Sequence, residues 1–172
     1  DFSVKDAEAI KKIERTTNHD VKAVEYFLRD KFDGLNLQEY KEWIHFGLTS
    51  QDINNSALPL LIRDAMSNVY IPLLDTVREE MDAHAKQYEN QPMLARTHGQ
   101  PASPTTMGKE WKVYLERIDE QLNHLKAMPV KGKFGGATGN FNAHKVTFPG
   151  IDWRVFADDF MRNLGIERSF YT

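Results

Sequence analysis

The stretch 57-ALPLLIRDAMSNVYIPLLDTVREEM-81 decides the fold class, because its apolar residues recur at spacings of three and four. That period places them on one face of an α-helix. The same pattern extends over roughly residues 51–89, which would be on the order of 60 Å long if unbroken. Pro59 and Pro72 each lack a backbone N–H, so we expect a bend or a break at both positions.

A second apolar stripe over residues 107–125 predicts another long helix. Ser103 and Pro104 favour a helix start just before it, because a hydroxyl can cap a helix and proline suits its first position. Two long amphipathic helices joined by a short irregular link should pack antiparallel, as in a bundle. Further helices are expected from Ser3 to about residue 15, from a cap at Thr17 or Asn18 to 33–34, over 37–45 and over 152–164.

The sequence therefore predicts an all-α fold, with short helices followed by long antiparallel ones. The composition changes near residues 46–50, which suggests a domain boundary between residues 1–48 and 49–172. The chain starts at Asp1 without a methionine and stops just after a helical pattern. We therefore expect it to be an internal piece of a longer, truncated polypeptide.

The composition excludes several classes of protein. Apolar residues make up 41% and charged residues 27%, with a net charge of −3, so no basic surface argues for a nucleic-acid partner. The longest uncharged apolar run is far short of the ~20 residues of a membrane span. The sequence shows no charged-then-apolar leader pattern, so we do not expect a secreted protein. The chain has no cysteine, which excludes disulfides and fits a cytoplasmic location.

Two polar clusters coincide with expected helix starts. Asn18, His19 and Asp20 form one, and the adjacent hydroxyls of Thr49 and Ser50 form the other. Plain helix capping explains both. The alternative is that the free amides and the positive dipole end, together with these side chains, bind a carboxylate or phosphate of a ligand.

A third cluster is 96-RTHGQP-101, in which His98 lies between Thr97 and a glycine. Small neighbours leave the ring accessible, and histidine is the side chain suited to proton transfer near neutral pH. The alternative is a histidine that is structural or merely exposed. The glycine-rich stretch 131-KGKFGGATGN-140 matches neither standard phosphate-binding pattern, so nucleotide binding through this loop alone is a weak hypothesis.

Metal binding has little support in the sequence. Glu42 and His45 have the E-x-x-H spacing of di-iron bundles, but such a site needs a second pair and two more carboxylates. No H-E-x-x-H motif and no G-x-S-x-G nucleophile motif is present. We therefore expect no metal site and no cofactor.

Taken together, these stretches resemble the adenylosuccinate lyases, of the bacterial kind, within the fumarase/aspartase/argininosuccinate lyase superfamily. The resemblance covers essentially the whole chain, in the family's order and spacing. The matching stretches are 13-IERTTNHDVKAVEYFL-28, 45-HFGLTSQDINN-55, 96-RTHGQPASPTTMGKE-110 and 131-KGKFGGATGNFNAH-144.

The resemblance implies a β-elimination that releases fumarate from adenylosuccinate, giving AMP, and from the related succinyl imidazole-carboxamide ribotide. It implies an acid–base role for His98 and substrate contacts for Asn18, His19, Asp20, Thr49, Ser50 and Thr97, with Lys131 and Asn140 as weaker candidates. It also implies a cytoplasmic homotetramer with a small-molecule nucleotide substrate. Residues 1–48 would end the N-terminal helical domain, and residues 49–172 would begin the central bundle.

The sequence departs from the family in one respect. The family's general base is a serine in an S-S-x-M-P-x-K-x-N-P loop, and no such motif occurs here. The chain alone is therefore expected to be inactive. The alternatives are another lyase of the superfamily (argininosuccinate lyase, fumarase or aspartase), a di-iron bundle, or a non-catalytic helical scaffold whose polar clusters are all caps.

Overall fold

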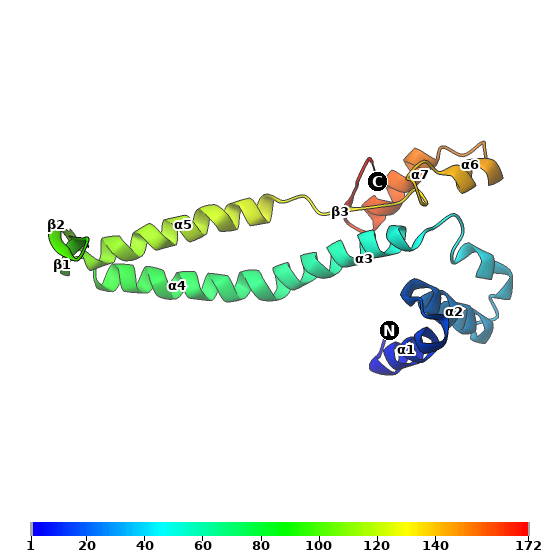
Figure 1. Cartoon of the computed structure of the whole chain (residues 1–172), viewed down its shortest axis with the longest axis horizontal. Coiled ribbons are helices and arrows are strands. Elements are labelled where there is room, and N and C mark those ends of the chain that lie inside the picture. The colour runs from blue at the N-terminus through cyan, green and yellow to red at the C-terminus, as the bar shows by residue number, and fades with distance from the viewer. Residues whose placement is uncertain (1, 172) are drawn as a thin grey trace. The chain divides into compact units, whose positions relative to one another are not determined.

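The computed structural model describes residues 2–171 and is built mainly from helices, which confirms the expected fold class (Figure 1). In chain order the helices are α1 (Val4–Thr17), α2 (Asp20–Gly34), the 3-10 helix η1 (Gln38–Trp43), α3 (Ser50–Ala65), the π-helical turn η2 (Met66–Tyr70), α4 (Ile71–Gln87), α5 (Met107–Ala127), α6 (Asn142–Thr147) and α7 (Trp153–Asn163). The strands are β1 (Pro92–Thr97), β2 (Gln100–Thr106), β3 (Lys131–Gly132) and β4 (Glu167–Arg168).

The chain divides into two compact units. Unit 1 contains the residues up to Leu60 together with those from Lys131 onward, and unit 2 contains Leu61–Val130. This division differs from the boundary at 48/49, which concerns the domains of a longer protein and stays a prediction.

The two prolines of the long apolar stripe behave differently. Pro59 lies inside α3, which continues through it without interruption, so the bend or break expected there is not a break in the helix. Pro72 begins α4 directly after η2, where the Ile71 N–H donates to the carbonyl of Met66, five residues earlier. A proline ring collides with the carbonyl four residues before it, and the wider π turn relieves that collision. The irregularity expected at Pro72 is therefore a π-helical turn, and the helix continues through it from α3 into α4.

Unit 2 is an antiparallel pair of helices, α4 and α5, which lie side by side in Figure 1. Ion pairs link the two helices, from Arg78 to Asp119 and from Lys112 to Asp82. At the end where they meet, a Cβ on Gly108 would lie only 2.4 Å from the carbonyl oxygen of Ala85. Only glycine permits this close approach, and the predicted antiparallel packing of the two long helices is confirmed.

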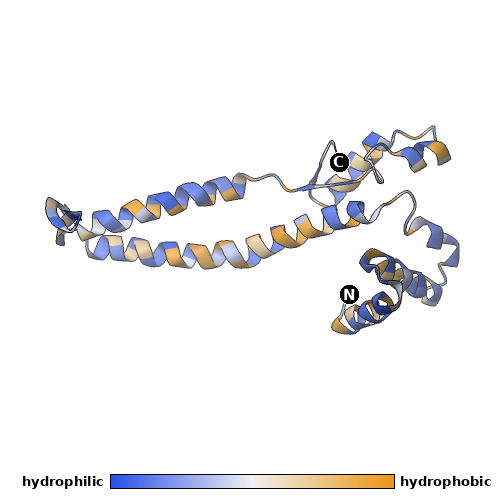
Figure 2. Cartoon of the chain, in the orientation of Figure 1, coloured by the Kyte–Doolittle hydropathy of each residue, from blue (hydrophilic) through white to orange (hydrophobic). Residues whose placement is uncertain are grey.

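One side of the long stripe is exposed to solvent, and Figure 2 shows the apolar segments along these helices in orange. Between 50% and 66% of each side chain's surface is exposed at Leu61, Ile62, Val69, Leu73 and Val77. Leaving such a row of large aliphatic side chains in water is unfavourable, and contiguous apolar surface of this kind marks an interaction face.

The link between α4 and α5 is a β-hairpin and not the irregular loop expected from its prolines. Strands β1 and β2 pair antiparallel, with Leu94 opposite Pro104 and Thr97 opposite Gln100. The helix start predicted at Ser103 is wrong, because α5 is capped instead by Thr106, whose hydroxyl accepts from the Lys109 N–H at 3.3 Å. A two-stranded hairpin has only edges, so its prolines need not donate to a neighbouring strand.

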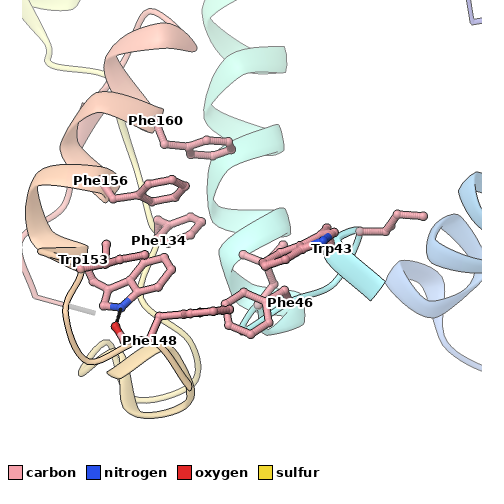
Figure 3. Close-up of a pocket in the computed structure, with 10 residues that line it drawn as sticks. Trp43, Phe46, Phe134, Phe148, Trp153, Phe156 and Phe160 are labelled. Carbon is pink, nitrogen blue, oxygen red and sulfur yellow. Dashed lines mark hydrogen bonds between the residues drawn. The ribbon is translucent and has the colours of Figure 1, made fainter. Parts of the chain in front are cut away.

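The core of unit 1 forms around α7, where Trp153, Ala157 and Met161 are buried. Beside it lies an aromatic cavity of about 570 Å³, into which Phe156 and Phe160 project from α7 (Figure 3). The short strands β3 and β4 pair in parallel, and β4 contacts α7. The residues that line the cavity are Trp43, Ile44, Phe46, Leu48, Phe134, Phe148, Ile151, Trp153, Phe156 and Phe160.

His144 is buried in this aromatic core, with 1% of its surface exposed. Its ring centroid lies 4.8 Å from that of Trp153 and 5.4 Å from that of Phe134. Among the described residues, neither of its ring nitrogens has a hydrogen-bond partner. A Cβ on Gly47 would lie 2.4 Å from its Nε2, and Gly47 also has a φ of +65°. Burial lowers the pKa of His144, and the charge of Asp52 only partly opposes this shift.

The buried state of His144 predicts a stability that falls on mild acidification. The folded-state pKa lies below the unfolded value of about 6.5, so the unfolded state takes up the proton first as the pH falls. Stability is then lost below that pH, by no more than about 1.4 kcal/mol per pH unit for one proton. Chemical denaturation between pH 7.5 and 5 should show this loss, and His144→Phe should reduce the slope.

The matched control is His124→Phe, at an exposed position of α5, which should keep the wild-type slope. Glu25 should not contribute to the change of stability between pH 7.5 and 5. Burial raises its pKa, but hydrogen bonds from Lys22 and His45 outweigh that effect and lower the pKa below its usual value of 4.5. Its contribution is therefore lost only at more acidic pH. An unchanged slope in His144→Phe would contradict the assignment.

Candidate functional site

The predicted site residues of unit 1 lie at the N-termini of α2 and α3. The prediction that Thr17 or Asn18 caps α2 is wrong, because α1 extends to Thr17 and Asn18 ends it in the left-handed region, with a φ of 51°. Asparagine tolerates this conformation better than most residues. His19 is therefore the residue that caps α2.

The orientation of the His19 ring follows from its hydrogen bonds. Its Nδ1 accepts from the backbone N–H of Lys22 at 3.2 Å, so the proton of the neutral ring must be on Nε2. That Nε2 lies 3.2 Å from the Oγ of Ser50, the first residue of α3, and donates to it. The hydroxyl proton of Ser50 then remains available for another acceptor. The structure thus brings two of the sequence clusters into direct contact.

Thr49 and Asp20 complete the two helix starts. The Thr49 N–H donates to the Asp52 carboxylate at 2.8 Å, which forms half of a capping box for α3. Thr49 also lines a small pocket of about 240 Å³ together with the glycine loop at residues 135–138. The Asp20 carboxylate accepts from the Val21 N–H at 2.7 Å and is exposed. Two positive helix ends are therefore held next to each other through His19 and Ser50.

Asp52 holds the glycine loop against the start of α3, and sequence reasoning did not single out this role. Only 3% of its surface is exposed, and its Oδ1 accepts from the ammonium of Lys133 at 2.7 Å and from the Gly135 N–H at 3.0 Å. Its Oδ2 accepts from Thr49 and from the Gly136 N–H at 3.0 Å. Four hydrogen bonds satisfy this buried charge, as burial of a carboxylate requires.

A second buried carboxylate, Glu25, ties α2 to the segment that leads into α3. Its Oε2 lies 2.5 Å from the Nδ1 of His45 and 2.5 Å from the Nζ of Lys22. Glu42, the partner that a di-iron hypothesis gave to His45, is instead bound by Arg29 at 2.7 Å. Within residues 2–171, no three acidic, histidine or cysteine side chains are grouped as a metal site would require.

Thr97 and His98 belong to unit 2, at the tip of the β1–β2 hairpin. His98 has a φ of 48° and Gly99 a φ of 78°, so these two residues form the type I′ turn that favours tight hairpins. Both Thr97 and His98 are exposed, which confirms the expected accessibility of the ring. The guanidinium of Arg96 donates to the Gly99 carbonyl at 3.3 Å and stabilises the turn.

The predicted residues thus form two groups, one in each compact unit. Asn18, His19 and Asp20 adjoin Thr49 and Ser50 in unit 1. The weaker candidate Lys131 lies 3.6 Å from Glu167 as an ion pair, and Asn140 is exposed in the glycine loop. A catalytic site that combines both groups is a proposal.

A model of a protein family described as lyase matches residues 1–160 of the chain. The chain belongs to this lyase family. Adenylosuccinate lyase from Dictyostelium discoideum is 54% identical over 167 residues, and the enzyme from Escherichia coli strain K12 is 45% identical over 172 residues. The alignments cover 95% and 99% of this lyase chain. They span only 36% and 38% of those relatives, in line with a piece of a longer protein.

Solved structures agree on the fold of this lyase chain. The fumarate lyase from Mesorhizobium sp. BNC1 superposes with a TM-score of 0.79 at 24% identity, over 99% of this chain and 38% of the other. The β-carboxy-cis,cis-muconate cycloisomerase from Acinetobacter calcoaceticus sp. ADP1 gives 0.73 at 22% identity, over 96% of this chain and 37% of the other. Because the identities are low, these two likenesses bear on the fold alone. Among residues 2–171, no helix is long and apolar enough to cross a membrane.

Proposed function

We propose that this chain is part of an adenylosuccinate lyase that releases fumarate from adenylosuccinate to leave AMP, and acts likewise on the succinyl imidazole-carboxamide ribotide of purine synthesis. The observation that carries the proposal is the identity of 43–54% with curated adenylosuccinate lyases over 95–100% of the chain. The other superfamily lyases are the alternative within the enzyme class.

The proposed reaction is a β-elimination. A base removes a proton from the succinyl carbon next to the C–N bond, and the electrons of the broken C–H bond form the double bond of fumarate. The C–N bond breaks, and an acid protonates the nitrogen that remains on the purine. Since the family's base is a serine in a motif that this sequence lacks, we assign the acid role to His98, with Thr97 orienting the substrate beside it.

The substrate carries carboxylates, and the α2 and α3 helix starts are suited to bind one. Positive helix ends attract anions, and the Ser50 hydroxyl can donate because His19 already donates to its oxygen. Asp52 and Glu25 satisfy their charges internally, through Lys133 and His45 among others, so they do not oppose an incoming carboxylate as free anions would. We assign Asn18, His19, Asp20, Thr49 and Ser50 to substrate binding.

Replacing Ser50 with alanine should weaken substrate use in the full-length enzyme. A hydrogen bond to a charged group is worth about 1.5–3 kcal/mol, which corresponds to a fall in kcat/KM of roughly 10- to 100-fold. The fall should come mainly from a higher KM. Steady-state kinetics measure it, and Ser67→Ala, at an exposed position of η2, is the control that should stay at the wild-type value. A Ser50→Ala enzyme with unchanged kinetics contradicts the binding role.

Assembly is part of the same proposal. The exposed stripe along α3 and α4, with Leu61 and Leu73 more than 60% exposed, supports a helical core shared between subunits. We propose a cytoplasmic homotetramer without nucleic-acid or membrane partners, with the bundle domain beginning at residue 49. The 172 residues alone lack the serine loop and are proposed to be inactive.

A substrate panel tests the identity of the lyase. The full-length protein should consume adenylosuccinate with a kcat/KM at least a hundredfold above that for argininosuccinate, malate or aspartate. Preference for one of those three would move the assignment to the matching lyase. A full-length protein inactive on all four would favour the non-catalytic scaffold, whose polar clusters act only as caps.

A further inference from the structure

A small basic pocket lies beside the glycine loop in unit 1, and of the sequence-based site candidates only the weaker one, Asn140, lines it. We call it the arginine pocket, and its volume is about 240 Å³. Three cations and no acidic side chain line it. Its lining residues are Thr138, Gly139, Asn140, Phe141, Lys145, Arg154, Arg168, Phe170 and Tyr171.

Arg168 is the fixed part of the pocket. Only 5% of its side chain is exposed, and its Nε donates to the Asp158 carboxylate at 2.5 Å. The guanidinium lies over the rings of Phe141 and Phe170, at 5.9 Å and 5.1 Å from their centroids. These contacts hold the guanidinium in one orientation before any ligand arrives.

One end of that guanidinium lacks a partner. The NH2 nitrogen of Arg168 is buried and makes no hydrogen bond within residues 2–171. Arginine stays protonated, so leaving an N–H of this group buried and unpaired is unfavourable. Because Arg168 lines the pocket, a ligand acceptor that reached this nitrogen would satisfy it.

The charge of the pocket is not balanced by neighbouring side chains. Asp158 offsets Arg168, but Lys145 and Arg154 form no ion pair among the described residues. Both are exposed at the pocket's edge, where they can reach an anion without moving the core. A cationic ligand would be repelled by these groups, and an uncharged ligand would leave their charge unbalanced.

We propose that the arginine pocket binds a small oxyanion of the phosphate type. The two-pronged donor of arginine matches the spacing of phosphate oxygens, and lysine adds a point charge. A volume of about 240 Å³ is below the ~300–1,000 Å³ of pockets that enclose drug-sized ligands, so it suits one phosphate group and not a whole nucleotide. The inference does not depend on the proposed lyase activity.

Calorimetric titration of the full-length protein with inorganic phosphate, at constant ionic strength set with chloride, tests the proposal. Saturable binding is expected, and the double variant Lys145→Gln/Arg154→Gln should weaken it at least about tenfold, because two charge-assisted contacts are lost. Arg162→Gln is the matched control: this exposed arginine of α7 pairs with Asp159 and does not line the pocket. It should bind phosphate like the wild type.

One further variant and one further ligand complete the test. Arg168→Lys keeps the positive charge but loses the second N–H donor of the guanidinium, so it should also weaken phosphate binding. The melting temperature of this variant shows whether its fold is intact. A titration with AMP shows whether the pocket takes a free phosphate or the phosphate group of a nucleotide. Binding of either ligand supports the proposal if the double variant weakens that binding to the same extent. Phosphate binding that is absent, or that the double variant leaves unchanged, overturns the proposal.

Discussion

Replacing His98 with alanine in the full-length protein lowers kcat on adenylosuccinate by roughly 10²–10⁴-fold, the usual contribution of an acid–base group. The nitrogen that leaves the succinyl carbon is a poor leaving group unless a proton reaches it as the C–N bond breaks. The acid role proposed for His98 requires an accessible ring, and this residue lies at an exposed turn of the β1–β2 hairpin. An absorbance assay of adenylosuccinate breakdown measures the loss.

The fold should not suffer from this substitution. Alanine tolerates the φ of 48° at this position less well than histidine does. The ring is exposed, however, so its removal should cost little packing. His98→Asn keeps a residue suited to that conformation and should lose activity to a similar extent. His124→Ala, at an exposed site of α5, is the control with normal activity. Activity of His98→Asn within tenfold of the wild type excludes proton transfer by this ring.

Replacing Asp52 with alanine lowers the free energy of unfolding by about 3–5 kcal/mol, the usual cost of breaking a buried ion pair from one side. The change leaves the ammonium of Lys133 buried without its carboxylate, since 7% of that side chain is exposed. It also leaves the Gly135 and Gly136 N–H groups without an acceptor. Urea denaturation measures the effect.

A control on the same helix separates the buried pair from surface charge. Asp64 pairs with Arg63 at 3.0 Å but is 58% exposed, so Asp64→Ala should cost no more than about 1 kcal/mol. Adding Lys133→Met to Asp52→Ala should recover part of the loss, because the uncompensated charge is then removed. A cost below 1 kcal/mol for Asp52→Ala would contradict its role as the anchor of the glycine loop.

Local signals in the sequence were enough to predict the long helices and their pairing. The three- and four-residue spacing of the apolar stripes depends only on helix geometry, and the irregularity at Pro72 follows from its missing N–H. The accessibility of His98 was also readable, because its neighbours are small. The signal for the hairpin was present but weak, since histidine followed by glycine can form the two left-handed residues of a type I′ turn.

Contacts between distant residues could not be read in the same way. Asp52 and Lys133 are 81 positions apart, and Glu25 and His45 are 20 apart, so no local pattern pairs them. The cap of α2 was assigned to Thr17 or Asn18 because hydroxyls and amides usually cap helices. His19 takes that position instead because its Nδ1 accepts from the Lys22 N–H while its Nε2 contacts Ser50.

Equilibrium binding of adenylosuccinate to the slow full-length His98→Asn enzyme tests the division of roles most directly. We assign proton transfer to His98 and substrate binding to the cluster of His19 and Ser50. Calorimetry should therefore find intact substrate bound with an affinity close to the wild-type KM, and the added Ser50→Ala change should weaken that binding at least about tenfold. Equal affinity with and without the Ser50 hydroxyl, or no binding to either enzyme, would contradict the account.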